Sequence, residues 1–152
     1  MILFLTRSIC VADLDAAVTG VLGNEDSAAD QFECNLGSSE GRPIPYIHIH
    51  GTADQVVPFD GNGAGFKSVE ETVATFRDLN LCGGASAGEV TYQNNTVTCT
   101  SYCPDDRNNV TKCRVEGGGH DWFAPGSCPG VGCSDIDSTA VVVDFFLRHS
   151  RE

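Results

Sequence analysis

The chain has 152 residues, of which 41% are hydrophobic and 20% are charged, a composition typical of a globular protein rather than a disordered one. Nine basic and 21 acidic residues give a formal net charge of −12 at pH 7, which argues against nucleic acid or an anionic membrane as a partner. No apolar run approaches the roughly 20 residues that span a bilayer. The length favours one domain, residues 1–152.

The first half of the chain predicts two strands. Residues 1–10 favour a short helix, and the apolar run 16–22 favours a strand that is buried on both faces. Residues 24–42 are polar and predict a loop. The β-branched and aromatic run 44–50 predicts a second strand, which ends at Gly51.

A helix is predicted after Ser68, because Ser68 and Glu71 have the spacing of a capping box. Apolar residues then recur every three or four positions from Val69 to Leu79, which gives one helical stripe. The glycines after Cys82 are expected to end this helix.

The last third of the chain predicts a short strand, 96–100, a longer strand, 110–116, and a helix that opens at 134–137. Helices that separate apolar strands favour a parallel α/β sheet. One face of the last helix is expected to be apolar and to consist of Ile136, Ala140, Val143 and Leu147.

Two polar residues follow the predicted strands at the same interval. Asp54 lies four residues beyond the second strand, and His120 lies four residues beyond the strand 110–116. Reactive groups of open α/β sheets gather beyond the carboxyl ends of the strands, so we expect these side chains to meet. Such an Asp holds the imidazole in one tautomer and leaves its other nitrogen as a general base.

Several segments carry a family pattern. Residues 42–59 contain H-G-T-A-D-Q-V-V-P, residues 116–122 read E-G-G-G-H-D-W, and residues 143–149 contain F-F-L-R-H. Together with the helix start at 68–73, they resemble the polyhydroxybutyrate depolymerase and type-C feruloyl esterase family. The resemblance implies the C-terminal portion of an α/β-hydrolase sheet, with parallel strands and flanking helices.

The same resemblance implies roles for individual residues. Asp54 would be the acid and His120 the base of a serine triad, whose members follow one another in the order Ser, Asp, His. No G-x-S-x-G nucleophile motif occurs in the sequence, so we expect the N-terminal half, with the nucleophile elbow, to precede Met1. Ser8 has no glycine neighbours and is not assigned as the nucleophile. Trp122 is a candidate for binding substrate in the acyl pocket, and a purely structural role is equally open.

The implied activity is hydrolysis of a carboxylic ester, either a polyester such as polyhydroxybutyrate or a phenolic ester of the plant wall, with no cofactor. This chain alone is expected to be inactive, since the serine and the oxyanion donors would lie upstream. One alternative is a secreted, non-enzymatic binding module derived from the esterase fold. Another is a chain whose missing half is supplied by a separate polypeptide.

Two further patterns have ordinary explanations. His48 and His50 alternate on one strand face and could bind a metal, but hydrogen-bonded strand histidines are favoured and no metal site is assigned. The run Gly61–Gly65 lacks the lysine of a phosphate-binding loop and favours a flexible loop.

The eight cysteines include no C-x-x-C pair, and the chain has two glycosylation sequons, at Asn94 and Asn109. These features favour a disulfide-bonded, extracellular glycoprotein, although no signal peptide is recognised at the N-terminus. Eight cysteines allow 105 pairings. Cys128–Cys133, which closes a small Gly/Pro loop, is the favoured pair, and Cys10–Cys34 is a second one.

Overall fold

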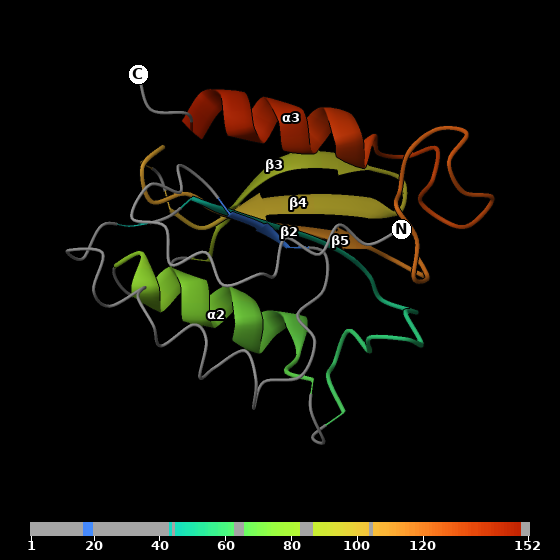
Figure 1. The fold of residues 1–152 in the computed structure, drawn as a ribbon, viewed down its shortest axis with the longest axis horizontal. Helices are drawn as coiled ribbons and strands as arrows, with labels where there is room; N and C mark the ends of the chain where they lie inside the picture. The colour runs from blue at the N-terminus through green and yellow to red at the C-terminus, as the bar shows by residue number, and fades with distance from the viewer. Residues whose placement is uncertain are drawn as a thin grey trace.

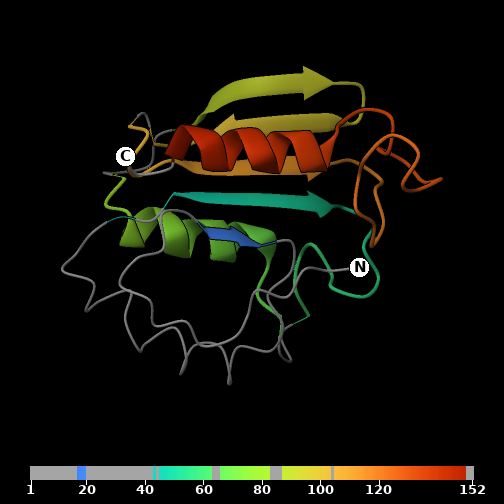
Figure 2. The same ribbon diagram turned by 45° about the horizontal axis from the view of Figure 1, so that its top comes forward.

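The computed structural model describes residues 17–19, 43, 45–62, 66–82, 87–103 and 105–149. Five strands form one sheet in the order β1-β2-β5-β4-β3, and two helices, α2 and α3, lie on its opposite faces (Figures 1 and 2). The helix expected at 1–10 and the loop expected at 24–42 lie outside the described residues. The elements are β1 Ala17–Thr19, β2 Tyr46–Gly51, α2 Val69–Leu79, β3 Glu89–Asn94, β4 Val97–Ser101, β5 Val110–Val115 and α3 Ser138–His149.

The expected fold class, a portion of a parallel α/β-hydrolase sheet, is wrong because the sheet is mixed. β1, β2 and β5 run parallel, but β4 runs antiparallel to β5 and to β3. The chain forms two strands, β3 and β4, where only one was predicted. A tight turn at Asn95, whose φ is 42°, connects them and makes their pairing antiparallel. β3 escaped prediction because its sequence is mostly polar and all six of its residues are exposed.

β2 is buried along its whole length and divides the core in two. Ile47 and Ile49 belong to the apolar cluster that includes Phe145 of α3. Tyr46 belongs to the second cluster and stacks on Phe76 of α2, with ring centroids 3.6 Å apart. The alternation of side chains along a strand therefore gives each helix its own face of β2.

The predicted capping box of α2 is confirmed. The Glu71 backbone N–H donates to Ser68 Oγ at 3.1 Å, and the Ser68 N–H donates to the Glu71 carboxylate at 2.8 Å. The helix buries Val73 and Phe76 against the sheet.

α3 begins later than predicted, and its expected apolar face is wrong for Ala140, Val143 and Leu147, which are exposed, while Ile136 is buried just before the helix. The Asp137 side chain accepts the Ala140 N–H at 3.0 Å, so the helix begins at Ser138 rather than at 134–137. Phe145 is buried, while Leu147 is 72% exposed. Because Asp137 fixes where the helix starts, the face that carries Phe145 is turned toward the sheet. Ser138, which lies two helical turns before Phe145, is buried on the same face. Among the described segments, no helix is long and apolar enough to cross a membrane.

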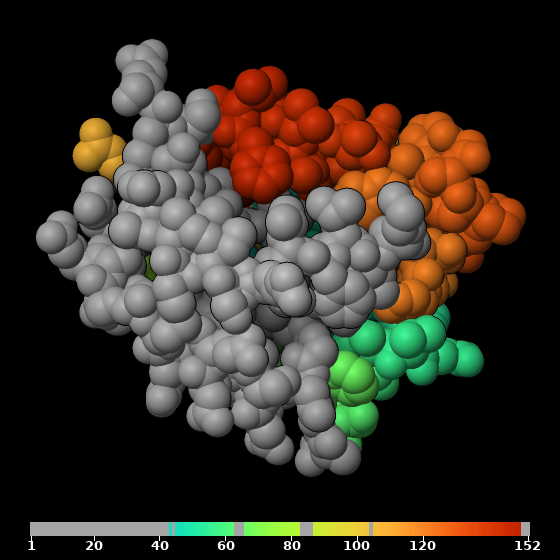
Figure 3. Space-filling model, viewed as in Figure 1, coloured from blue at the N-terminus to red at the C-terminus, as the bar shows by residue number. Residues whose placement is uncertain are grey.

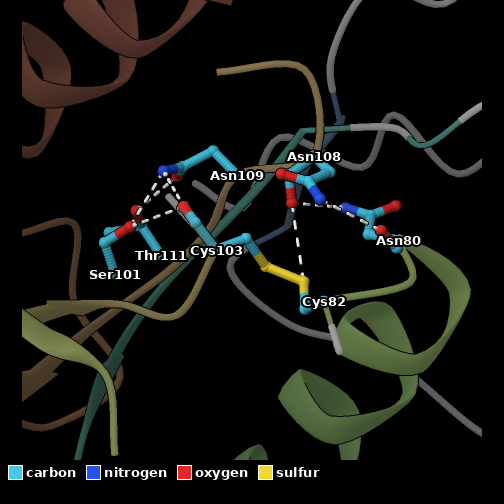
Figure 4. Close-up of a disulfide and its surroundings, with 7 residues drawn as sticks. All are labelled: Asn80, Cys82, Ser101, Cys103, Asn108, Asn109 and Thr111. Atoms are coloured by element: carbon cyan, nitrogen blue, oxygen red, sulfur yellow. Dashed lines mark hydrogen bonds between the residues drawn. A yellow bond between two sulfur atoms is a disulfide. The ribbon is translucent and has the colours of Figure 1, made fainter. Parts of the chain in front are cut away.

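Three disulfides connect the described cysteines, and the predicted pair Cys128–Cys133 is confirmed. Cys99–Cys113 joins directly opposed residues of β4 and β5. Cys82–Cys103 ties the chain after α2 to the chain after β4 (Figure 4). The suggested Cys10–Cys34 pair lies outside the described residues. These bonds are compatible with an extracellular protein, since disulfides persist in oxidising compartments.

Hydrogen bonds between loops surround the Cys82–Cys103 bond (Figure 4). The side chain of Asn80 donates to the Asn108 carbonyl at 3.3 Å, and the Asn108 side chain donates back at 3.4 Å. Next to them, the Asn109 side chain donates to Ser101 Oγ at 2.8 Å. This end of the sheet, opposite to the carboxyl ends of β2 and β5, is therefore fixed by covalent and polar links.

Candidate active site

The parallel pairing of β2 with β5 brings two loops to one edge of the sheet. Gly51 and Val115, the last residues of these strands, are paired in register. The Thr52 N–H donates to the Val115 carbonyl at 2.9 Å, and the Ala53 N–H donates to the Gly118 carbonyl at 2.9 Å. Figure 3 shows the segment after β2 (green) beside the segment after β5 (orange). Main-chain bonds therefore set the distance between the two loops.

Gly51 permits this close approach. A Cβ atom at position 51 would lie 2.2 Å from the Gly118 carbonyl oxygen, far inside van der Waals contact. The Thr52 hydroxyl adds a further link, because it accepts the Gly117 N–H at 2.8 Å. Any larger residue at position 51 would separate the loops.

The loops place Asp54 against His120, and the contact expected from their positions is confirmed. His120 Nδ1 lies 2.8 Å from Asp54 Oδ2. The Asp54 side chain is 4% exposed, and that of His120 is 25% exposed. The other carboxylate oxygen, Oδ1, accepts the backbone N–H groups of Val56 and Val57 at 2.8 and 2.9 Å. The carboxylate is thus bound on both oxygens.

Asp54 is ionised at neutral pH. Burial favours its neutral form, but hydrogen bonds from the Val57 N–H, the His120 ring and a second backbone N–H outweigh burial and hold its pKa below the ordinary 3.8. An ionised Asp54 requires His120 to carry a proton on Nδ1, and in the neutral ring Nε2 then has the lone pair. Among the described residues, no side chain hydrogen bonds to Nε2. This nitrogen can accept a proton from a nucleophile.

Trp122 lies two residues beyond His120 and is 37% exposed. Its indole N–H donates to Thr139 Oγ1 of α3 at 2.9 Å, and its carbonyl accepts the Ser127 hydroxyl at 2.8 Å. These bonds give Trp122 a structural role at the start of α3. Its role in binding substrate stays a prediction.

The strand histidines are hydrogen bonded, as the sequence interpretation favoured. Tyr46 OH lies 2.7 Å from His48 Nδ1, His48 Nε2 lies 3.1 Å from His50 Nδ1, and His50 Nε2 lies 2.9 Å from the Val57 carbonyl oxygen. Sequence reasoning missed that this row leads to Asp54. The available signal was the alternation of Tyr46, His48 and His50 on one face of a buried strand that ends near Asp54.

The remaining candidates add no further groups to the site. Within the described ranges, no cluster of three or more His, Cys, Asp or Glu side chains could hold a metal ion. Ser8 lies outside these ranges, and so do residues 63–65 of the glycine-rich run.

Comparisons with known proteins do not identify the chain. No protein-family model matches it, and no curated protein matches it either. The function must therefore be argued from the geometry of the site and from the sequence segments that form it.

Proposed function

We propose that Asp54 and His120 are the acid and the general base of a carboxylic ester hydrolase of the serine-esterase type. The observation that carries the proposal is the 2.8 Å contact between His120 Nδ1 and Asp54 Oδ2. An ionised, hydrogen-bonded carboxylate behind an accessible imidazole is the arrangement that activates a hydroxyl nucleophile. The resemblance of residues 42–59 and 116–122 to the polyhydroxybutyrate depolymerase and feruloyl esterase family supports the same chemistry.

In the proposed reaction, His120 Nε2 takes the proton of a serine hydroxyl while the serine oxygen attacks the ester carbonyl carbon. The protonated ring then gives this proton to the leaving alcohol, and an acyl-enzyme remains. Water attacks the acyl-enzyme with the same help from His120 and releases the acid and the free serine. Asp54 stays ionised throughout and stabilises the imidazolium. The serine and the oxyanion donors come from outside the described residues, and the ester is a polyester or a phenolic plant-wall ester.

A longer chain, extended upstream in frame through a G-x-S-x-G motif, tests the proposal. Residues 1–152 should not hydrolyse methyl ferulate or a short acyl ester, whereas the longer chain should. In the longer chain, His120→Ala should lower kcat by about 10⁶-fold, and Asp54→Asn should lower it by roughly 10⁴-fold because the wrong tautomer forms. Asp60→Asn, an exposed carboxylate of the same loop, is the matched control and should leave kcat unchanged.

Two outcomes would overturn the proposal as stated. A stop codon directly upstream of Met1, with a stable folded product, would reject the esterase and favour a binding module. Hydrolysis by residues 1–152 alone that depends on His120 would show that the nucleophile has been misplaced, and Ser8 would be the first residue to replace.

Secretion belongs to the same proposal. A thiol titration of denatured, unreduced protein should find few free cysteines. The side-chain amides of both sequon asparagines are hydrogen bonded, that of Asn94 to the Asp135 carbonyl at 3.1 Å and that of Asn109 to Ser101 Oγ at 2.8 Å. The two differ in exposure, because Asn94 is exposed while Asn109 is half-buried. Secreted protein should therefore carry a glycan at Asn94 rather than at Asn109, which peptide mapping after deglycosylation would detect.

A further inference from the structure

A row of buried polar side chains runs along β2 and ends at Asp54. As whole residues, Tyr46, His48, His50 and Asp54 are exposed by 0%, 2%, 4% and 8%. Beyond the three hydrogen bonds of the row, His50 Nε2 lies 3.4 Å from Asp54 Oδ2. The two imidazole planes are parallel to within 3°. Buried polar groups are costly unless each finds a partner, so the order of this row calls for an explanation.

The Val57 carbonyl fixes the position of every proton in the row. A carbonyl oxygen only accepts, so His50 Nε2 must carry the proton in its 2.9 Å contact with Val57. In a neutral His50 ring, Nδ1 is then an acceptor and requires a proton on His48 Nε2. His48 Nδ1 in turn accepts the Tyr46 hydroxyl. When both rings are neutral, all the donors of the row therefore point toward Asp54.

The environment of the rings keeps them neutral. Burial, together with the neighbouring His50 and Lys112, lowers the pKa of His48 from 6.5 to about 3. Burial also lowers the pKa of His50, even though the Val57 carbonyl and Asp54 act in the opposite sense. The row therefore presents Asp54 with a fixed N–H dipole and not with a positive charge.

We infer that His50 is a positioning residue for the pair Asp54–His120, and that Tyr46 and His48 act behind it by fixing its tautomer. The inference rests on the proposed function of that pair. Val57 donates its N–H to Asp54 Oδ1 at 2.9 Å and accepts the His50 N–H through its carbonyl. His50, Val57 and Asp54 therefore form a closed set that fixes the rotation of the carboxylate. This rotation determines where Oδ2 meets His120.

The first test needs no substitution and no turnover. Nitrogen-15 NMR of the intact 152-residue chain at neutral pH should show His48 and His50 as neutral rings, each protonated on Nε2. Finding His50 protonated on Nδ1, or on both nitrogens, would reverse the row and overturn the inference. Because this readout does not depend on ester hydrolysis, it stays decisive even if the proposed function fails.

The second test compares two substitutions of His50, to Gln and to Asn, whose side-chain amides each take the place of one ring nitrogen. The amide of His50→Gln reaches the Nε2 position and can donate toward Val57 and Asp54, whereas that of His50→Asn reaches only the Nδ1 position. The NMR signal of the His120 Nδ1 proton should persist in His50→Gln. In His50→Asn it should broaden or disappear, because the carboxylate keeps its bonds to the Val56 and Val57 N–H groups but loses the N–H group of His50 that faces Oδ2.

Two controls separate positioning from loss of stability. Phe145→Leu removes buried volume in α3, which packs on the opposite face of β2 from the row, and should destabilise the fold without changing the His120 signal. If His50→Asn does not fold, Tyr46→Phe replaces it, because it removes one hydroxyl and leaves the ring packing on Phe76 in place. It should shift the His50 nitrogen resonances and weaken the His120 signal. An unchanged His120 signal in both His50→Asn and Tyr46→Phe would refute the inference.

Discussion

One face of β2 carries Ile47 and Ile49, and the other carries Tyr46, His48 and His50, although all five side chains are buried. On the first face, burial needs only that neighbours fill the volume. On the second, each polar atom needs a partner at a particular place. The apolar face therefore mainly supplies stability, whereas the polar face, on our inference, also determines the orientation of one carboxylate.

The largest expected loss of stability comes from the apolar face. Ile47→Ala should lower the free energy of unfolding by about 2–5 kcal/mol, because it leaves a cavity among the residues that pack on Phe145. Urea denaturation would measure this loss. The His120–Asp54 hydrogen bond should survive. Its disappearance in the folded variant would show that the apolar face also orients the carboxylate.

Acid should act on the polar face. The pKa of His48 is lowered from 6.5 to about 3 in the folded chain, so the unfolded chain binds more protons between these values. The stabilisation is complete above pH 6.5 and falls as the pH decreases, by roughly 1.4 kcal/mol for each pH unit or about 3 kcal/mol by pH 4. Urea unfolding at several pH values would measure the slope.

A matched variant assigns that slope. His48→Gln removes one titrating ring and should flatten the pH dependence, while His50 and His149, whose pKa values are also lowered by burial, retain their part. Asp54 contributes at lower pH. Because its pKa is lowered from 3.8, its contribution to the free energy of unfolding is complete above pH 3.8 and is lost only below that pH. An unchanged slope in His48→Gln would contradict the assignment.

Tyr46→Phe should cost about 1–3 kcal/mol, because it leaves His48 Nδ1 buried without the hydroxyl donor at 2.7 Å. The ring stacking on Phe76 stays, so the cost reports the hydrogen bond rather than packing. Combining Tyr46→Phe with Ile47→Ala should give additive losses if the two faces are independent. A loss in the double variant that differs strongly from the sum of the two single losses would show that the two faces of β2 are not independent.

The smallest effect is expected at Trp122, on the side of α3. Trp122→Phe removes the 2.9 Å hydrogen bond to Thr139 and should cost about 1 kcal/mol, since the residue is partly exposed. Thr139→Val removes the same bond from the other partner. If Trp122 also lines the acyl pocket, Trp122→Ala in the longer, active chain should raise KM, while Thr139→Val should not.

The sequence was most informative where local pattern and position agree. Asp54 and His120 could be paired because each follows a strand end at the same interval, and adjacent parallel strands bring such positions together. The capping box of α2 was predictable because its bonds lie within four residues.

Elements that depend on distant contacts were not predictable. β3 has a polar sequence and is recognised as a strand only through its pairing with β4. The buried face of α3 depends on where Asp137 starts the helix. The alternation along β2 placed His48 and His50 on one face, but it could not show which ring nitrogen meets which partner.

The close approach of Gly51 to Gly118 has a consequence for how this site can evolve. Every replacement of Gly51, alanine and proline included, adds a Cβ atom, which would lie 2.2 Å from the Gly118 carbonyl oxygen. A variant library sorted only for folded protein should therefore lose nearly all changes at position 51. Changes at His120, whose side chain is 25% exposed, should be lost mainly when the library is sorted for catalysis. The two depletion profiles would separate the geometric requirement of the site from the chemical one.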